Sequence, residues 1–119
     1  MNKLFFPKKL RLLHPKDFDY VFQYPKRVFS PEIVIFGRLN SLQYPRIGFT
    51  ISKKNIKLSH DRNRIKRLVR EYFRLNQDKL PLMDFIILAK KSVVNLNNQE
   101  ITKKIGYLWF RHCHLARRF

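Results

Sequence analysis

The strongest constraint on the fold comes from residues 62–75, where apolar and cationic side chains recur with helical spacing. At about 100° per residue, the apolar side chains fall on one side of a helix. They are Ile65, Leu68, Val69, Tyr72 and Leu75. The opposite side carries Asn63 and five cations, which are Arg62, Lys66, Arg67, Arg70 and Arg74. The pattern predicts a long helix, roughly residues 61–76, with one face packed on a sheet and the other presented as a cationic ridge.

The segments around this helix predict a small α+β domain. Residues 14–22 are typical of a short helix, with Pro15 at its first position and Pro25 ending it. Residues 33–36 and 46–52 are β-branched or alternating runs, and we expect these two strands to pair as a hairpin. Residues 84–89 are apolar almost throughout, which predicts a central strand covered on both faces.

Residues 98–116 predict a last helix, with one buried stripe formed by Ile101, Ile105, Leu108 and His112. The expected element order is therefore αββαβα, a single-domain sandwich in which helices pack on one sheet. At 119 residues the chain has the size of one domain, 1–119. Its first residues, 1–13, form a basic N-terminal arm, in which we expect residues 3–11 to lack regular structure beyond an extended lead-in.

The charge of the chain indicates a polyanionic partner. There are 26 Lys and Arg against 8 Asp and Glu, a formal net charge of +18. Such a charge repels itself in a compact domain, so nucleic acid is the first candidate partner and an anionic membrane surface the second. No apolar run approaches the roughly 20 residues needed to span a bilayer. One cysteine, Cys113, cannot form an internal disulfide, and we expect a cytoplasmic protein that does not bind membranes.

The cationic ridge favours nucleic acid over a merely solvated helix face. Most of its cations are Arg, whose planar guanidinium pairs with phosphate in two hydrogen bonds, and Glu71 alone cannot balance them. Aromatic residues near the charge favour RNA over DNA, because exposed rings stack on unpaired bases. Phe18, Phe22 and Phe36 are the candidates. Each of them could equally be an ordinary core residue, and the sequence leaves that choice open.

The chain lacks the residue pattern of a nuclease acting alone. Metal-dependent phosphoryl chemistry needs clustered carboxylates, whereas the eight acids here are scattered one by one. His112, Cys113 and His114 are adjacent, so on a helix they point in different directions and make a poor metal site. We expect no catalytic residue and no metal ligand in this chain.

One run of residues is specific to a family. Arg62-Asn63-Arg64-Ile65-Lys66-Arg67-Leu68, followed by Arg70, resembles the arginine-rich signature of the bacterial ribonuclease P protein family. The resemblance extends over essentially the whole chain. It includes residues 18–22, 48–54 and 84–91, while residues 54–61 and 109–117 resemble the enterobacterial branch.

The resemblance implies a fold and a role. The fold would be the αββαβα sandwich with a left-handed βαβ crossover, the ribosomal protein S5 domain 2-like fold. The chain would join a catalytic RNA in a 1:1 complex, and the holoenzyme would remove the 5′ leader of precursor tRNA with Mg²⁺ held by RNA. The alternatives are a ribosomal or RNA-chaperone protein without an enzyme role and, last, a DNA-binding regulator.

The resemblance also implies two sets of site residues. The surface for the catalytic RNA would comprise Lys53, Lys54, Arg62, Asn63, Arg64, Lys66, Arg67, Arg70 and Arg74. The cleft for the leader would comprise Phe18, Phe22, Val34, Phe36, Thr50 and Ala89, with Lys54 beside them.

Overall fold

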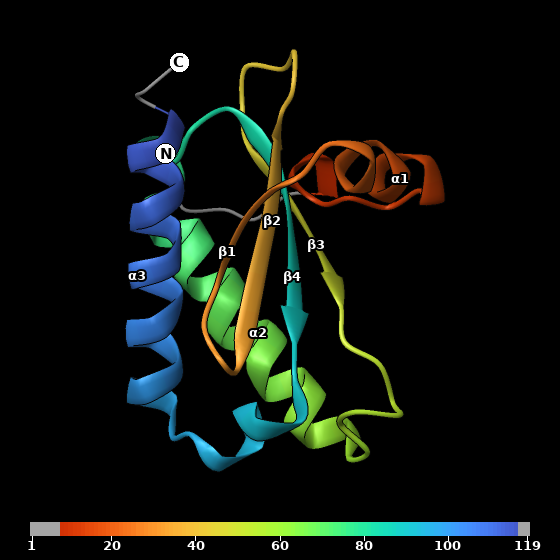
Figure 1. Ribbon diagram of the computed structural model, residues 1–119, viewed down its shortest axis with the longest axis vertical. Helices are drawn as coiled ribbons and strands as arrows, with labels where there is room; N and C mark the ends of the chain where they lie inside the picture. The colour runs from red at the N-terminus through yellow and green to blue at the C-terminus, as the bar shows by residue number, and fades with distance from the viewer. Residues whose placement is uncertain (1–7, 117–119) are drawn as a thin grey trace.

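Four strands form one sheet in the computed structural model, which describes residues 8–116 (Figure 1). The elements in chain order are α1 (Pro15–Gln23), β1 (Lys26–Phe29), β2 (Ile33–Leu39), β3 (Arg46–Thr50), α2 (Ser59–Asn76), β4 (Met83–Ala89) and α3 (Asn98–Ala116). Three short 3-10 helices, Lys8–Leu10, Gln77–Lys79 and Lys91–Asn95, join or precede them. Both long helices lie within two residues of the bounds that the periodicity predicts.

The strand order is β1-β2-β4-β3, which corrects the predicted hairpin and adds one strand to the predicted element order. The predicted hairpin between residues 33–36 and 46–52 is wrong, because β4 lies between β2 and β3 and pairs with both. The hairpin partner of β2 is instead β1, a four-residue edge strand that the sequence pattern did not reveal. β3 and β4 are parallel neighbours joined through α2, which forms the expected βαβ crossover.

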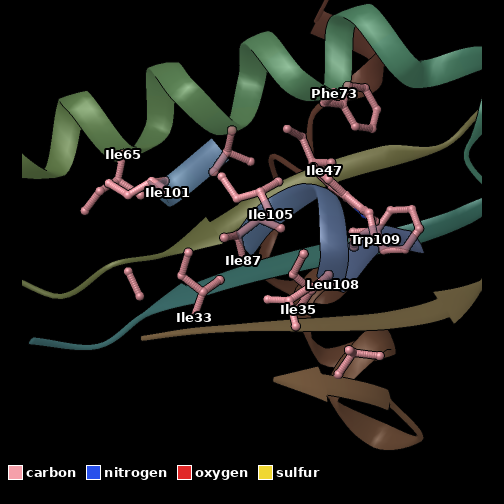
Figure 2. Close-up of a cluster of buried hydrophobic side chains, with 14 of the residues drawn as sticks. Ile33, Ile35, Ile47, Ile65, Phe73, Ile87, Ile101, Ile105, Leu108 and Trp109 are labelled. Carbon is pink, nitrogen blue, oxygen red and sulfur yellow. The ribbon is translucent and has the colours of Figure 1, made fainter. Parts of the chain in front are cut away.

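One face of the sheet packs against α2 and α3 and holds the main core. Figure 2 shows Ile65 and Phe73 of α2 and the stripe Ile101, Ile105, Leu108 of α3 meeting strand side chains. Trp109 lies 5.5 Å from Tyr72 and 5.7 Å from Phe85, measured between ring centroids. The stripe predicted for α3 is confirmed, because all four of its residues are buried. In α2 the buried residues are Ile65, Val69 and Phe73, whereas Leu75, predicted to be inside, is exposed.

α1 packs on the opposite face of the sheet, over a second and smaller cluster. Val21 is buried there with Leu12 and Ile86, and Phe18 and Phe36 pack against them. Gly48 of β3 allows this approach, because a Cβ at that position would lie 2.7 Å from Cζ of Phe18. The sheet thus has a face covered by two long helices and a face covered only in part, by α1 (Figure 1).

The N-terminal arm differs from the expected extended lead-in. Residues 1–7 lie outside the described part of the chain. Lys8–Leu10 form a 3-10 helix, and Leu10 is buried in the main core. Arg11 forms an isolated parallel β-bridge with Ile47 of β3. The apolar side chains at positions 10 and 12 explain the difference, since each one inserts into one of the two clusters.

Of the helices within residues 8–116, none combines the length and the apolar character that crossing a bilayer requires.

Candidate RNA-binding surfaces

The solvent side of α2 carries a group of polar and cationic side chains. Asn63 and Arg67 are exposed, and Lys66, Arg70 and Arg74 are half-buried at its margins. Arg74 donates to Oε2 of Glu71 at 2.6 Å, so its charge is partly compensated. This side of α2 faces solvent because the opposite side is held in the core by three buried residues, Ile65, Val69 and Phe73. We call Asn63, Lys66, Arg67, Arg70 and Arg74 the α2 ridge.

Two arginines predicted for this surface make hydrogen bonds within the protein. Arg62 turns back toward the loop before α2, where Nη1 donates to the carbonyl oxygens of Ile56 at 2.7 Å and Lys57 at 2.9 Å. Arg64 reaches the start of α3, where Nη1 donates to Oδ1 of Asn98 at 2.8 Å. Placing Arg62 on the outer side of the helix was therefore wrong. Arg62 thus links the preceding loop to α2, and Arg64 links the start of α3 to α2.

Arg70 lies where α2 meets the edge of β3. Its guanidinium carbon is 5.3 Å from the ring centroid of Phe49, and its Nε is buried without a hydrogen-bond partner in the described residues. Burial lowers the pKa of Arg70, and the charge of Arg11 lowers it further. Both arginines line a hollow of ≈ 240 Å³ whose other walls include Phe18 and Gly48. This hollow connects the α2 ridge with the face that α1 covers.

Lys53 and Lys54 lie in the exposed turn between β3 and α2. The turn is closed by the amide of Asn55, which donates to Oγ of Ser52 at 3.1 Å. Both lysines therefore belong to the connection between the end of β3 and the first turn of α2.

The strand register defines the other candidate surface. One row of side chains runs across all four strands on the α1 face: Phe29, Val34, Leu88 and Thr50. Phe29 is 56% exposed, and Leu88 and Thr50 are half-buried, so the row is only partly covered. The next row contains Phe36, Ile86 and Gly48, over which α1 lies. We call these two rows, with the α1 side chains above them, the α1 face.

The three candidate stacking residues differ in how accessible they are. Phe18 is half-buried and packs in the second cluster, as a core residue would. Phe22 is 43% exposed and meets the half-buried Phe36 edge to face, with ring centroids 5.1 Å apart. Of these three rings, Phe22 is therefore the best placed to meet a base, and Phe36 packs against it.

One predicted cleft residue lies on the wrong side of the sheet. Ala89 is buried in the main core, facing α2 and α3, because side chains alternate along β4 and its neighbour Leu88 faces α1. The structure does bring Phe18, Phe22, Val34, Phe36 and Thr50 together on the α1 face. The sequence reasoning missed Leu88 and Phe29. Period-two alternation within residues 84–89 could have identified Leu88, whereas Phe29 lies on the strand that was not predicted.

The far end of the α1 face is polar and holds a buried charge. The side chain of Asp84 accepts from Arg46 in two hydrogen bonds of 2.9 and 2.7 Å and from Nδ2 of Asn40 at 2.9 Å. The hydrogen bonds to Asp84 raise the pKa of Arg46. Nearby, Arg38 lies 3.8 Å from the ring centroid of Tyr20 and donates to its carbonyl oxygen. The contacts of Arg38 with Tyr20 hold α1 against β2.

Within residues 8–116, no three His, Cys, Asp or Glu side chains come together in an arrangement suited to a metal ion.

Comparison with known proteins gives a consistent result. The family model described as Ribonuclease P matches residues 6–113. The ribonuclease P protein component of Photorhabdus laumondii is 62% identical over 117 residues, 98% of each chain. That of Escherichia coli O157:H7 is 57% identical over the same length and coverage. The solved structure of the RNase P protein from Thermotoga maritima aligns with a TM-score of 0.75 at 27% identity, covering 85% of this chain and 96% of that one.

Proposed function

Because this chain belongs to the ribonuclease P protein family, we propose that it is the protein subunit of a bacterial ribonuclease P holoenzyme. In that role it binds the catalytic RNA and the 5′ leader of precursor tRNA, and it promotes the endonucleolytic cut that gives the mature 5′ end. The chemistry resides in the RNA, and the protein contributes binding energy.

The observation that carries the proposal is the α2 ridge. Its cations stand on a helix whose other face is fixed in the core, so the backbone that carries them is already ordered before RNA binds. Neutralising phosphates releases condensed counterions, which stabilises the folded catalytic RNA at moderate salt. Lys53 and Lys54 extend the positive surface into the loop before α2.

The α1 face is the proposed site for the leader. Binding of single-stranded RNA needs aromatic rings on which the bases stack and a surface between the rings that accommodates them. The rings are supplied by Phe22 and Phe36, and the surface by the row Phe29, Val34, Leu88 and Thr50. Mature tRNA lacks the leader, so contacts here favour the substrate over the product. The hollow between Arg11 and Arg70 lies where a strand would pass from this face to the α2 ridge.

Three further points belong to the same proposal. The Mg²⁺ ions of the reaction are held by RNA phosphates, which the scatter of the eight acids along this chain supports. One copy of the chain joins one catalytic RNA. The complex works in the cytoplasm, where precursor tRNA is made and where a lone cysteine stays reduced.

Phe22→Ala tests the leader site. In the reconstituted holoenzyme we expect the preference for precursor over mature tRNA to fall about fivefold or more, because a stacked base contributes about 1–3 kcal/mol. Affinity for mature tRNA should be unchanged. The measurement is the ratio of the two dissociation constants, with Phe29→Ala as a second variant of the α1 face.

Leu82→Ala is the matched control, since Leu82 is comparably exposed and lies outside both surfaces. If Phe22→Ala keeps the wild-type ratio while its circular dichroism shows a folded protein, the α1 face does not bind the leader.

A further inference from the structure

The outer side of α3 carries an aromatic and cationic stripe that neither proposed surface uses. Lys103, Tyr107, Phe110 and His114 recur at i, i+4, i+7 and i+11, which places them on one side of the helix. The buried stripe of Ile101, Ile105, Leu108 and His112 lies on the other side. We call Lys103, Tyr107, Phe110, Arg111 and His114 the α3 outer face.

The two rings of this face are accessible. Tyr107 is 61% exposed and Phe110 is 64% exposed, more than Phe22 or Phe29 of the α1 face. Phe110 also borders a hollow of ≈ 310 Å³ that Arg111, His114 and Leu115 complete. An aromatic ring beside a hollow with a guanidinium at its margin offers a base a stacking surface and offers its phosphate a donor.

The charge around the stripe is positive. The last acidic residue of the sequence is Glu100, and the described residues 101–116 contain three Lys or Arg, two His and no Asp or Glu. Glu100 accepts from the amide of Asn97 at the start of the helix, and Lys104, beside the stripe, pairs with Glu32 at 3.3 Å. A protein that bound two rings and several cations would need acidic side chains at the matching positions. In RNA, by contrast, every nucleotide carries both a negative phosphate and a base that can stack on a ring.

We propose that the α3 outer face binds an unpaired RNA nucleotide, whose base stacks on Phe110 and Tyr107 and whose phosphate contacts Arg111 or Lys103. The site is separate from the leader site, because α3 covers the face of the sheet opposite to α1 (Figure 1). A nucleotide bound here therefore belongs to a different RNA segment from the leader. The inference rests on the proposed function only in that the RNAs available to the site are the catalytic RNA and precursor tRNA.

Photo-crosslinking in the assembled holoenzyme tests the site directly. The photoreactive residue p-benzoylphenylalanine replaces Phe110 in one variant and the exposed Leu82 in a control, and each is irradiated with catalytic RNA alone and then with precursor tRNA added. In parallel, the double variant Tyr107→Leu with Phe110→Leu removes both rings but keeps apolar, helix-forming side chains. Phe110→Trp keeps a ring and should retain wild-type affinity.

We expect an RNA crosslink from position 110 and not from position 82, together with at least about fivefold weaker RNA binding by the leucine variant. A crosslink that forms with catalytic RNA alone assigns the nucleotide to that RNA, and one that needs precursor tRNA assigns it to the substrate. A crosslink to a second protein copy, no crosslink above the control, or unchanged affinity in the leucine variant would overturn the inference. The proposed function is tested separately in the same preparations, by whether the wild-type chain stimulates leader cleavage.

Discussion

At the scale of single residues, Asp84 shows how the fold accommodates a charge in its interior. Its carboxylate is 1% exposed and lies on a central strand, where an unpaired charge would be costly. The guanidinium of Arg46 and the amide of Asn40 satisfy its oxygens. Asp84 is therefore structural, although the sequence presents it only as one of eight scattered acids.

Arg46→Met should destabilise the free protein by about 3 kcal/mol, because it removes the counter-charge and leaves the carboxylate buried. Urea unfolding followed by circular dichroism measures this change in the free energy of unfolding. The control is Arg67→Met at an exposed helical position, which we expect to change stability by less than about 0.5 kcal/mol. Equal stability of the two variants would show that the pair with Asp84 does not stabilise the fold.

We expect His112 to make the stability of the protein depend on pH. It is fully buried, Nε2 donates to the carbonyl oxygen of Ile35 at 2.7 Å, and Nδ1 has no partner among residues 8–116. Burial lowers the pKa of His112 below 6.5. As the pH drops below about 6.5, this imidazole becomes protonated in the unfolded chain but stays neutral in the folded chain. The free energy of unfolding therefore falls as the pH drops below that value.

The prediction is a lower free energy of unfolding at pH 5.5 than at pH 7.5, with a smaller difference in His112→Gln. His114→Gln, at an exposed position of the same helix, should keep the wild-type difference. Urea unfolding at the two pH values measures both. The buried ring is not the source of the effect if His112→Gln retains the full pH dependence.

At the scale of secondary structure, helical periodicity predicted α2 well but placed its buried face about one position off. The predicted apolar side included Leu75 and omitted Phe73, whereas Phe73 is buried and Leu75 exposed. On a wheel at 100° per residue, Phe73 and Leu75 lie about 80° from Ile65 in opposite directions, so spacing does not decide which of the two is buried. Phe73 lies on the side that packs in the main core, where its ring meets Trp109 at 6.1 Å between centroids.

The same limit applies to the arginines of α2. The prediction placed Arg62 on the cationic side, although at 100° per residue it lies within about 20° of the buried Val69. There the loop before the helix supplies carbonyl groups within its reach. Side-chain contacts with segments far along the chain, such as Arg64 with Asn98, also cannot be found from local spacing. What the pattern did identify is the part of the ridge that remains exposed, Asn63 and Arg67.

The α2 ridge gives a prediction for salt dependence. Arg67→Ala should weaken binding of the catalytic RNA and reduce the slope of log affinity against log salt concentration by about one, because one phosphate contact is lost. Lys79→Ala removes an equal charge from the exposed turn after α2 and should leave the slope nearly unchanged. Filter binding across a salt series measures both. Equal slopes in Arg67→Ala and the wild type would place the RNA elsewhere.

At the scale of the whole molecule, the element types were predictable and their arrangement was not. Alternation identified β3 and the apolar run identified β4, since each signal is local. That β4 separates β2 from β3 depends on the path of α2 across the sheet, which local patterns do not determine. β1 was missed because Lys26 and Arg27 make half of this short edge strand polar.

The candidate sites were predictable to the extent that a family resemblance supplied them. Five of the six predicted cleft residues lie on the α1 face. Ala89 was wrong by one step of the strand, because adjacent residues face opposite sides of a sheet. The folded molecule presents the α2 ridge and the α1 face on different sides of one rigid sheet, and the hollow between Arg11 and Arg70 lies between them.

The most direct test of the account is reconstitution of the purified chain with a bacterial ribonuclease P RNA at low magnesium, in comparison with the RNA alone. We predict that the wild-type chain restores cleavage at the 5′ end of mature tRNA, that the chain without RNA shows no cleavage, and that Arg67→Ala requires more protein for the same rate. Cleavage by the chain alone, or no stimulation of the RNA by a folded wild-type chain, would contradict the account.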